Sequence, residues 1–144
     1  MYIGWQMKAF RAYDNDPLIE AKTNGSVKYL DMSIPQQTLR SFDWVMCMDI
    51  LKYIPPNFEE IALFNMAHLA RNGLAISWAS PGEGKLDQVN ERIRDYIENK
   101  LRLFCFLKDA NLTKIARQYA FIPFVRTNVI IFLRKKPCSF KYIK

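Results

Sequence analysis

The sequence has little of the chemistry that metal, redox and nucleophilic sites most often use. Its 144 residues include one histidine, three cysteines and five glycines, and the cysteines form no CxxC pair. A single imidazole, His68, excludes sites with several histidine ligands and gives little support to a histidine base. The segment NMAHLARNG spaces His68 as on a helix face, so we expect a surface or half-buried helical residue.

The cysteines are odd in number and far apart in the sequence. Cys47 and Cys105 lie in apolar runs, and Cys138 lies in the basic end of the chain. A free thiol in an apolar run behaves as a small hydrophobic side chain. We therefore expect neither a disulfide framework nor a zinc site.

Long hydrophobic runs are also lacking. No run reaches the eighteen or so apolar residues of a membrane-spanning helix. Charges interrupt the start MYIGWQMKAFRAYD, where a signal peptide would have an unbroken apolar segment. These absences predict a soluble, cytoplasmic protein with no membrane partner.

What the sequence does contain favours a folded domain. Half of the residues are apolar and 14% are aromatic, which excludes disorder and predicts a single domain over residues 1–144. The net charge is +7, and basic residues gather after residue 92, notably in RKKPCSFKYIK (134–144). That end could contact phosphates, but a solvated tail explains it equally well, and no motif favours nucleic acid.

Apolar runs alternate with helix-patterned segments, and this predicts an α/β fold with a mostly parallel sheet covered on both faces. The expected strands lie at 9–14, 27–34, 43–51 and 73–80, and the expected helices at 59–70 and 88–101. The chain then continues with an apolar run at 102–109, a helical pattern at 111–120 and a β-rich run at 128–136. The two runs predict a closing, hairpin-like pair at a sheet edge.

Two details of the middle segment carry further expectations. WVMCMDIL is apolar until Asp49, as in a strand buried on both faces, so we expect that strand to be central. Glu59 and Glu60 suit the first turn of the following helix, and Gly73 suits its carboxyl-terminal stop. Together these signals predict a βαβ unit.

Carboxylates follow three successive expected strands. Asp14 ends the first in AYDNDP, Asp31 the second in KYLDMS and Asp49 the third in CMDIL. Ligands of open α/β sheets bind beyond the carboxyl ends of the strands, where such carboxylates can accept hydrogen bonds from ribose hydroxyls or an adenine amino group. Turn formation or plain solvent exposure at strand exits is the competing interpretation of each aspartate.

From YDNDP to NVIIFLRKK, and most closely in FDWVMCMDILKYIPPNFEEIALFNMAHLARNGLAISWASPGEGKLDQVNER, the chain resembles class I S-adenosylmethionine (SAM)-dependent methyltransferases. The resemblance implies a Rossmann-like sheet with an antiparallel closing strand, and SAM as cofactor. It implies that Asp14 binds the ribose, that Asp31 and Met32 contact the adenine, and that Asp49 lies near the methionine moiety and the methyl-transfer site. Asn90, with its loop, would shape the acceptor side, so Asp49 and Asn90 are the candidate catalytic residues. The competing interpretation of Asn90 is a flexible connection between strand and helix.

The sequence departs from that family pattern in three places. Gln88 stands where members tend to have histidine, and Lys52 and Tyr53 stand where a Glu-His pair is usual. Nothing before Asp14 supplies the opening strand and its glycine-rich turn. A sheet without that strand would leave two apolar edges unpaired. Either the remaining strands close the gap, or the chain needs a partner, which could be a second copy of itself.

Three hypotheses follow. The first is a methyltransferase domain, truncated at its start, that transfers a methyl group to an unidentified acceptor. The second is a non-catalytic remnant of that fold that serves as a binding or interaction module. The third, ranked last, is nucleic-acid binding through the basic carboxyl end.

Overall fold

The structure is a computed structural model that describes residues 10–82, 89–136 and 138. Contacts within the chain divide it into two compact units, Met1–Met32 and Ser33–Lys144. The expectation of a single domain stays a prediction.

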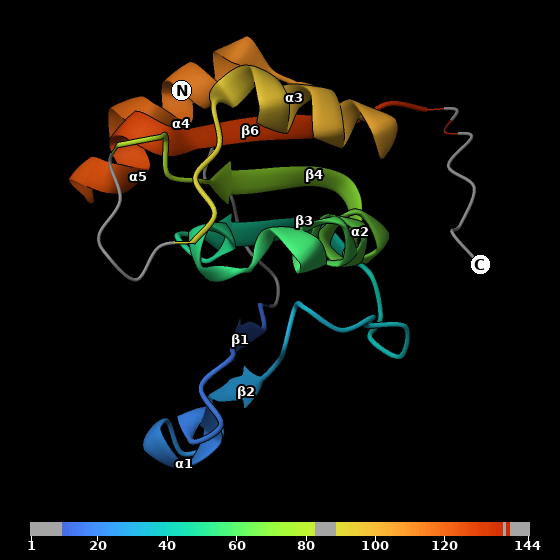
Figure 1. Cartoon of the computed structure of the whole chain (residues 1–144), viewed down its shortest axis with the longest axis vertical. Helices are drawn as coiled ribbons and strands as arrows, with labels where there is room; N and C mark the ends of the chain where they lie inside the picture. The colour runs from blue at the N-terminus through green and yellow to red at the C-terminus, as the bar shows by residue number, and fades with distance from the viewer. Residues whose placement is uncertain (1–9, 83–88, 137, 139–144) are drawn as a thin grey trace. The chain divides into compact units, whose positions relative to one another are not determined.

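The first unit is a small βαβ arrangement. Strands β1 (Ala12–Asp14) and β2 (Val27–Tyr29) pair in parallel, and helix α1 (Ile19–Lys22) connects them (Figure 1). The turn after α1 places Asn24 and Gly25 at positive φ, where glycine is favoured. Glu20 of α1 accepts a hydrogen bond from the Tyr29 N–H, which fixes the helix against β2.

The second unit contains a four-stranded sheet in the order β3 (Phe42–Met48), β4 (Ala70–Ser77), β6 (Val129–Arg134), β5 (Phe106–Lys108). β3 and β4 are parallel, and β6 is antiparallel to both of its neighbours. The expected antiparallel closing pair at the sheet edge is therefore confirmed. Its members β6 and β5 are neighbours in the sheet, although two helices separate them in the sequence.

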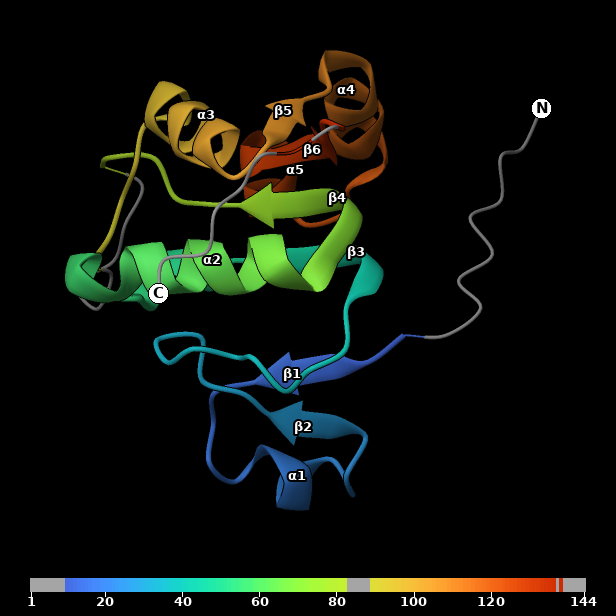
Figure 2. The same cartoon turned by 90° about the vertical axis from the view of Figure 1, so that its right-hand side faces the viewer.

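Helices cover both faces of this sheet, which confirms the α/β expectation. Helices α4 (Ala110–Tyr119) and α5 (Pro123–Asn128) supply Leu112, Ala116 and Val125 to the core around Ala75, Val129 and Ile131. The alternate side chains of β4 and β6, such as Leu74 and Phe132, point to the opposite face and are fully buried. Helix α2 (Glu59–Leu69) packs on β3 and β4, and α3 (Arg94–Leu103) packs on β5 (Figure 2).

Two short 3-10 turns, Leu51–Tyr53 and Pro56–Phe58, connect β3 to α2. Pro55 and Pro56 lie at this connection, and the expected βαβ unit is confirmed as β3, α2 and β4. Helix α3 begins six residues later than the pattern predicted, at Arg94, so Asn90 lies in the connection before it. His68 is a half-buried residue of α2 stacked on Phe64, as expected.

The position of β3 in the sheet corrects one expectation. β3 is an edge strand of the four-stranded sheet and not a central one. Its Cys47 is buried, but its Met46 is 70% exposed. The continuous apolar run in β3 therefore does not mean that both faces of this strand are buried.

Gly73 corrects another expectation, because it lies inside β4 and does not end α2. The helix passes into the strand at Ala70 without a connecting turn. Gly73 faces Trp44 across the β3–β4 ladder, and a Cβ at position 73 would lie 2.3 Å from the indole ring. The glycine is needed for this close approach of a ring to backbone and not for a helix stop.

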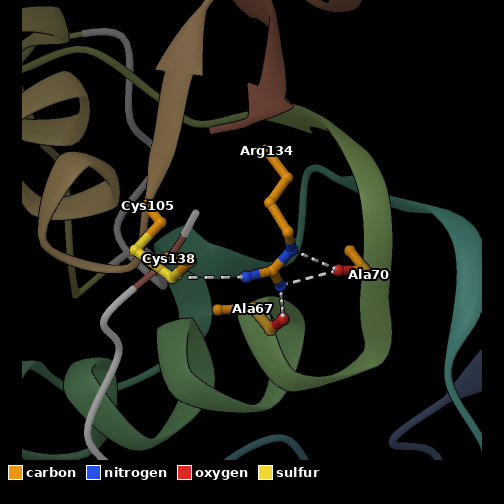
Figure 3. The surroundings of a disulfide bond; sticks show 5 residues. All are labelled: Ala67, Ala70, Cys105, Arg134 and Cys138. Carbon is orange, nitrogen blue, oxygen red and sulfur yellow. Dashed lines mark hydrogen bonds between the residues drawn. A yellow bond between two sulfur atoms is a disulfide. The ribbon is translucent and has the colours of Figure 1, made fainter. Parts of the chain in front are cut away.

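The expectation of three unpaired cysteines was also wrong, because Cys105 and Cys138 form a disulfide. Cys105 follows α3 at φ +66°, a left-handed position usual for glycine at a helix end. Figure 3 shows the guanidinium of Arg134 beside this disulfide, donating to the carbonyl oxygens of Ala67 and Ala70 and to Cys138 Sγ. The bond thus joins the segment after β6 to the end of α3.

Candidate functional site

In the first unit, the predicted carboxylates lie at neighbouring strand ends. β1 and β2 are parallel, so Asp14 at the end of β1 and Asp31 just beyond β2 share one edge of the sheet. The Asp16 N–H donates to Asp14 Oδ1 at 2.9 Å, and no described residue bonds to Asp14 Oδ2. Asp31 and Met32 are half-buried, and each already makes an interaction.

Asp16 belongs to the turn after β1, and both of its carboxylate oxygens already have partners within that turn and α1. Its Oδ1 accepts the Leu18 N–H at 2.9 Å, and its Oδ2 pairs with Lys22 at 2.5 Å. These bonds hold the pKa of Asp16 below its usual value. Turn formation therefore accounts for Asp16 fully, and for one of the two oxygens of Asp14.

In the second unit, Asp49 lies just beyond the end of β3, beside the end of β4. Its backbone adopts φ +63°, a conformation that non-glycine residues seldom take and that often marks functional positions. The Asp49 N–H donates to the hydroxyl of Ser77, the last residue of β4, at 2.8 Å. The two parallel strand ends are thus tied together at the edge where α/β folds bind ligands.

Lys52 neutralises Asp49. Its ammonium contacts Asp49 Oδ1, and its side chain is only 6% exposed. The same ammonium lies 5.1 Å from the centre of the Tyr53 ring and 4.5 Å from that of Phe124. Burial alone would lower the pKa of Lys52, but the hydrogen bond and charge of Asp49 outweigh it, so this pKa is raised.

Asn90 is linked to the same segment through its backbone. The N–H groups of Val89 and Asn90 both donate to the carbonyl of Lys52 at 3.0 Å, and the Asn90 carbonyl accepts from Trp78 Nε1 at 2.7 Å. Asn90 is 1% exposed. Its Nδ2 donates to Glu59, whereas its Oδ1 is a buried acceptor without a hydrogen-bond partner among the described residues.

Glu59 orients this asparagine and joins it to two further side chains. Only 4% exposed, it accepts from Asn90 Nδ2 and Arg92 Nε on one oxygen and from the Tyr96 hydroxyl on the other. Burial raises the pKa of Tyr96, and the adjacent charge of Glu59 raises it further. Because Glu59 holds Nδ2, the orientation of the amide leaves Oδ1 as the unpaired group.

Lys52 therefore connects Asp49 and Asn90, the two predicted residues of the second unit. The Lys52 ammonium contacts Asp49, and the Lys52 carbonyl accepts the Asn90 N–H. The sequence does not reveal the structural roles of Glu59, Arg92 and Tyr96. Its pattern predicts only that Glu59 is a carboxylate in the first turn of a helix. Its burial depends on Asn90, Arg92 and Tyr96, which lie 31 to 37 residues later, so no local signal reveals it. Gln88 lies outside the described residues.

Among the described residues, no cluster of histidine, cysteine, aspartate and glutamate could hold a metal ion. No helix in that part of the chain has the length and hydropathy to cross a membrane. The groups at the strand ends are hydrogen-bond acceptors, with one buried ammonium. Such groups suit a polar organic ligand more than a metal.

No protein-family model matches the sequence, and no curated protein has a similar one. Solved structures do match. Magnesium protoporphyrin IX methyltransferase from Synechocystis PCC 6803, with bound SAM, has a TM-score of 0.57 and 16% identity, over 85% of this chain and 58% of that one. A 1,6-didemethyltoxoflavin-N1-methyltransferase from Burkholderia thailandensis has a TM-score of 0.53 and 18% identity, over 87% of this chain and 60% of that one.

A structure described as a pericyclic reaction enzyme also matches, with a TM-score of 0.55 and 13% identity, over 90% of this chain and 37% of that one. The chain thus spans less than two thirds of the length of each of these structures. At such identities the likeness concerns architecture, and different reactions share that architecture. The chain has a class I methyltransferase-like fold.

Proposed function

We propose that the chain is part of a SAM-dependent methyltransferase that transfers a methyl group to an unidentified acceptor. The observation that carries this proposal is the recurrence of carboxylates at the ends of parallel strands, Asp14 and Asp31 in one unit and Asp49 in the other. Fold neighbours bind SAM or its product S-adenosylhomocysteine. Their likeness makes this cofactor the first to test.

Each unit, taken by itself, offers groups that suit a part of that cofactor. Asp14 Oδ2 and the Asp31 carboxylate can accept from ribose hydroxyls and the adenine amino group. Lys52 offers a cation that suits the amino-acid carboxylate, and Asp49 offers an acceptor for the amino group.

Bound SAM would supply an electrophilic methyl group, and the task of the protein is then alignment and exclusion of water. The Asp49–Ser77 bond fixes the two strand ends, and the Lys52 carbonyl fixes the backbone of Asn90. Asn90 Oδ1, held by the bond of Nδ2 to Glu59, could accept a hydrogen bond from the acceptor molecule. No described residue needs to act as a covalent nucleophile.

The second candidate is a non-catalytic module with the same fold. The Asp49–Lys52 ion pair favours it, because a neutralised carboxylate binds an ammonium group more weakly.

Calorimetric titration with SAM and S-adenosylhomocysteine separates the two candidates. We expect micromolar binding that Asp14→Ala and Asp31→Ala abolish. Asp43→Ala is the matched control, because Asp43 is an exposed aspartate near the amino end of β3, paired with Arg71. A folded chain that binds neither compound would overturn the methyltransferase proposal and leave the module.

A further inference from the structure

The connection between α4 and α5 exposes several large apolar side chains together. Tyr119 is 72% exposed, Phe121 95% and Ile122 62%, and Ile115, one helical turn before Tyr119, is 50% exposed. We call these four residues the apolar knuckle. Single exposed apolar residues are common on protein surfaces, but a contiguous group marks an interaction site.

The core of the second unit does not require these side chains. Leu112 and Ala116 on the inner face of α4 pack against the sheet, and the Thr113 hydroxyl accepts the Ile131 N–H at 3.0 Å. Ile115 and Tyr119 are four residues apart and therefore share another face of the helix. That face points to solvent, and its apolar character has no explanation within the unit.

The knuckle is held in a fixed conformation. Arg126 of α5 donates to the carbonyl of Ala120 from Nε at 3.0 Å and from Nη2 at 2.9 Å. Pro123 begins α5 directly after Ile122 and restricts the backbone there. These constraints keep Phe121 extended into solvent, so its exposure belongs to the fold.

Charge along the two helices that carry the knuckle has one sign. Residues 110–128, which contain α4, α5 and their connection, include Lys114, Arg117 and Arg126 and no aspartate or glutamate. The guanidinium of Arg117 donates to the Val129 carbonyl and that of Arg126 to the Ala120 carbonyl, whereas Lys114 is exposed. The segment that carries the knuckle is therefore positively charged.

We propose that the apolar knuckle docks on the surface of an anionic lipid membrane. Protruding aromatic and aliphatic side chains enter the interface between headgroups and acyl chains, while flanking cations meet the lipid phosphates and carboxylates. A fluid interface accepts a convex, fully exposed ring such as that of Phe121 without a matching pocket. The expectation of no membrane partner rested on the lack of spanning runs, which does not bear on surface docking.

Co-sedimentation of the whole chain with lipid vesicles tests this proposal. We expect binding to vesicles of phosphatidylcholine and phosphatidylserine in equal parts, weaker binding to phosphatidylcholine alone, and a decrease with added salt. The double variant Phe121→Ser, Ile122→Ser should lower partitioning about tenfold or more, because two apolar side chains no longer enter the interface. Lys114→Glu should weaken binding to the anionic vesicles only.

Leu103→Ser is the matched control, since Leu103 is a 70% exposed apolar residue on a different helix, α3. It should bind vesicles as the unchanged protein does. Urea unfolding of the double variant should match that of the unchanged protein, because both side chains are exposed. Neither substitution touches Asp14, Asp31 or Asp49, so the SAM titration is an independent result.

Three results would overturn the proposal. The first is no binding of the unchanged chain to anionic vesicles. The second is equal partitioning of the double variant and the unchanged chain. The third is a dimer in solution that the double variant converts to a monomer, which would assign the knuckle to a second copy of this chain.

Discussion

The two compact units present carboxylates at parallel strand ends in the same way but differ in what lies beneath them. No residue among 10–32 is buried, and this described part of the first unit contains two three-residue strands and a four-residue helix. In the second unit Leu74 and Phe132 are inaccessible to solvent. Local hydrogen bonds can thus place carboxylates at neighbouring strand ends. Only the second unit adds a buried core that stabilises this placement, since an isolated two-stranded sheet has marginal stability.

Hydrogen exchange should show this contrast most strongly. Amides of β4 and β6 should open with a free energy close to that of global unfolding, about 5 kcal/mol or more, whereas those of β1 and β2 should open at almost no cost. We expect protection factors that differ at least about a thousandfold, measured by mass spectrometry or NMR without ligand. Equal amide protection in the two units would show that the first unit is as stable as the second. Added S-adenosylhomocysteine should raise protection in β1 and β2 if the proposed function holds.

One substitution made in both units sharpens the contrast. Phe132→Ala removes a fully buried ring in the second unit and should cost about 3–5 kcal/mol in urea unfolding. Phe10→Ala removes a ring that is 73% exposed in the first unit and should change stability by less than about 0.5 kcal/mol. A large cost at Phe10 would show that the first unit has a core of its own.

The disulfide should stabilise the second unit by a smaller amount. Cys105 and Cys138 are 33 residues apart, and removing a bond that closes such a loop costs about 2–4 kcal/mol. Cys138→Ser should lower the unfolding free energy accordingly and leave amide exchange in β1 and β2 unchanged. Dithiothreitol should bring the unchanged chain to the same value and have no effect on the variant. A chain insensitive to both would show that the bond does not contribute.

The smallest effect concerns pH. Burial raises the pKa of the Cys47 thiol from 9.0 to about 12. The folded state therefore keeps a proton that the unfolded state loses above pH 9, so this contribution to stability is present below pH 9 and declines between pH 9 and 12. From pH 9 to 10 the decline should be about 1 kcal/mol. The Cys47→Ala variant should not show this decline, which urea unfolding of the variant and the unchanged protein at each pH would measure. An equal decline in both proteins would show that another group is responsible.

Much of the second unit follows from its sequence, because burial there has a local signature. The apolar runs at 43–51 and 128–136 predicted β3 and β6, and the periodic segments at 59–70 and 111–120 predicted α2 and α4. The order of carboxylates after successive strands predicted where Asp14, Asp31 and Asp49 lie. Their roles toward a cofactor stay predictions.

What the sequence did not reveal depends on residues distant along the chain. The Cys105–Cys138 bond needs the end of α3 to meet the segment after β6, and spacing alone does not specify that meeting. The burial of Glu59 depends on Asn90 and residues beyond it. Lys52 was recognised as a departure from the family pattern, but its pairing with Asp49 requires the φ +63° turn between them.

The contact between Trp44 and Gly73 constrains which substitutions this sheet can accept. A ring lies where any Cβ at position 73 would have to be, so even alanine there should displace the indole or the strand. A smaller side chain at position 44 would lift that restriction and leave a void beside β4. The two positions, 29 residues apart in the sequence, are therefore coupled: a side chain at position 73 requires a smaller one at position 44.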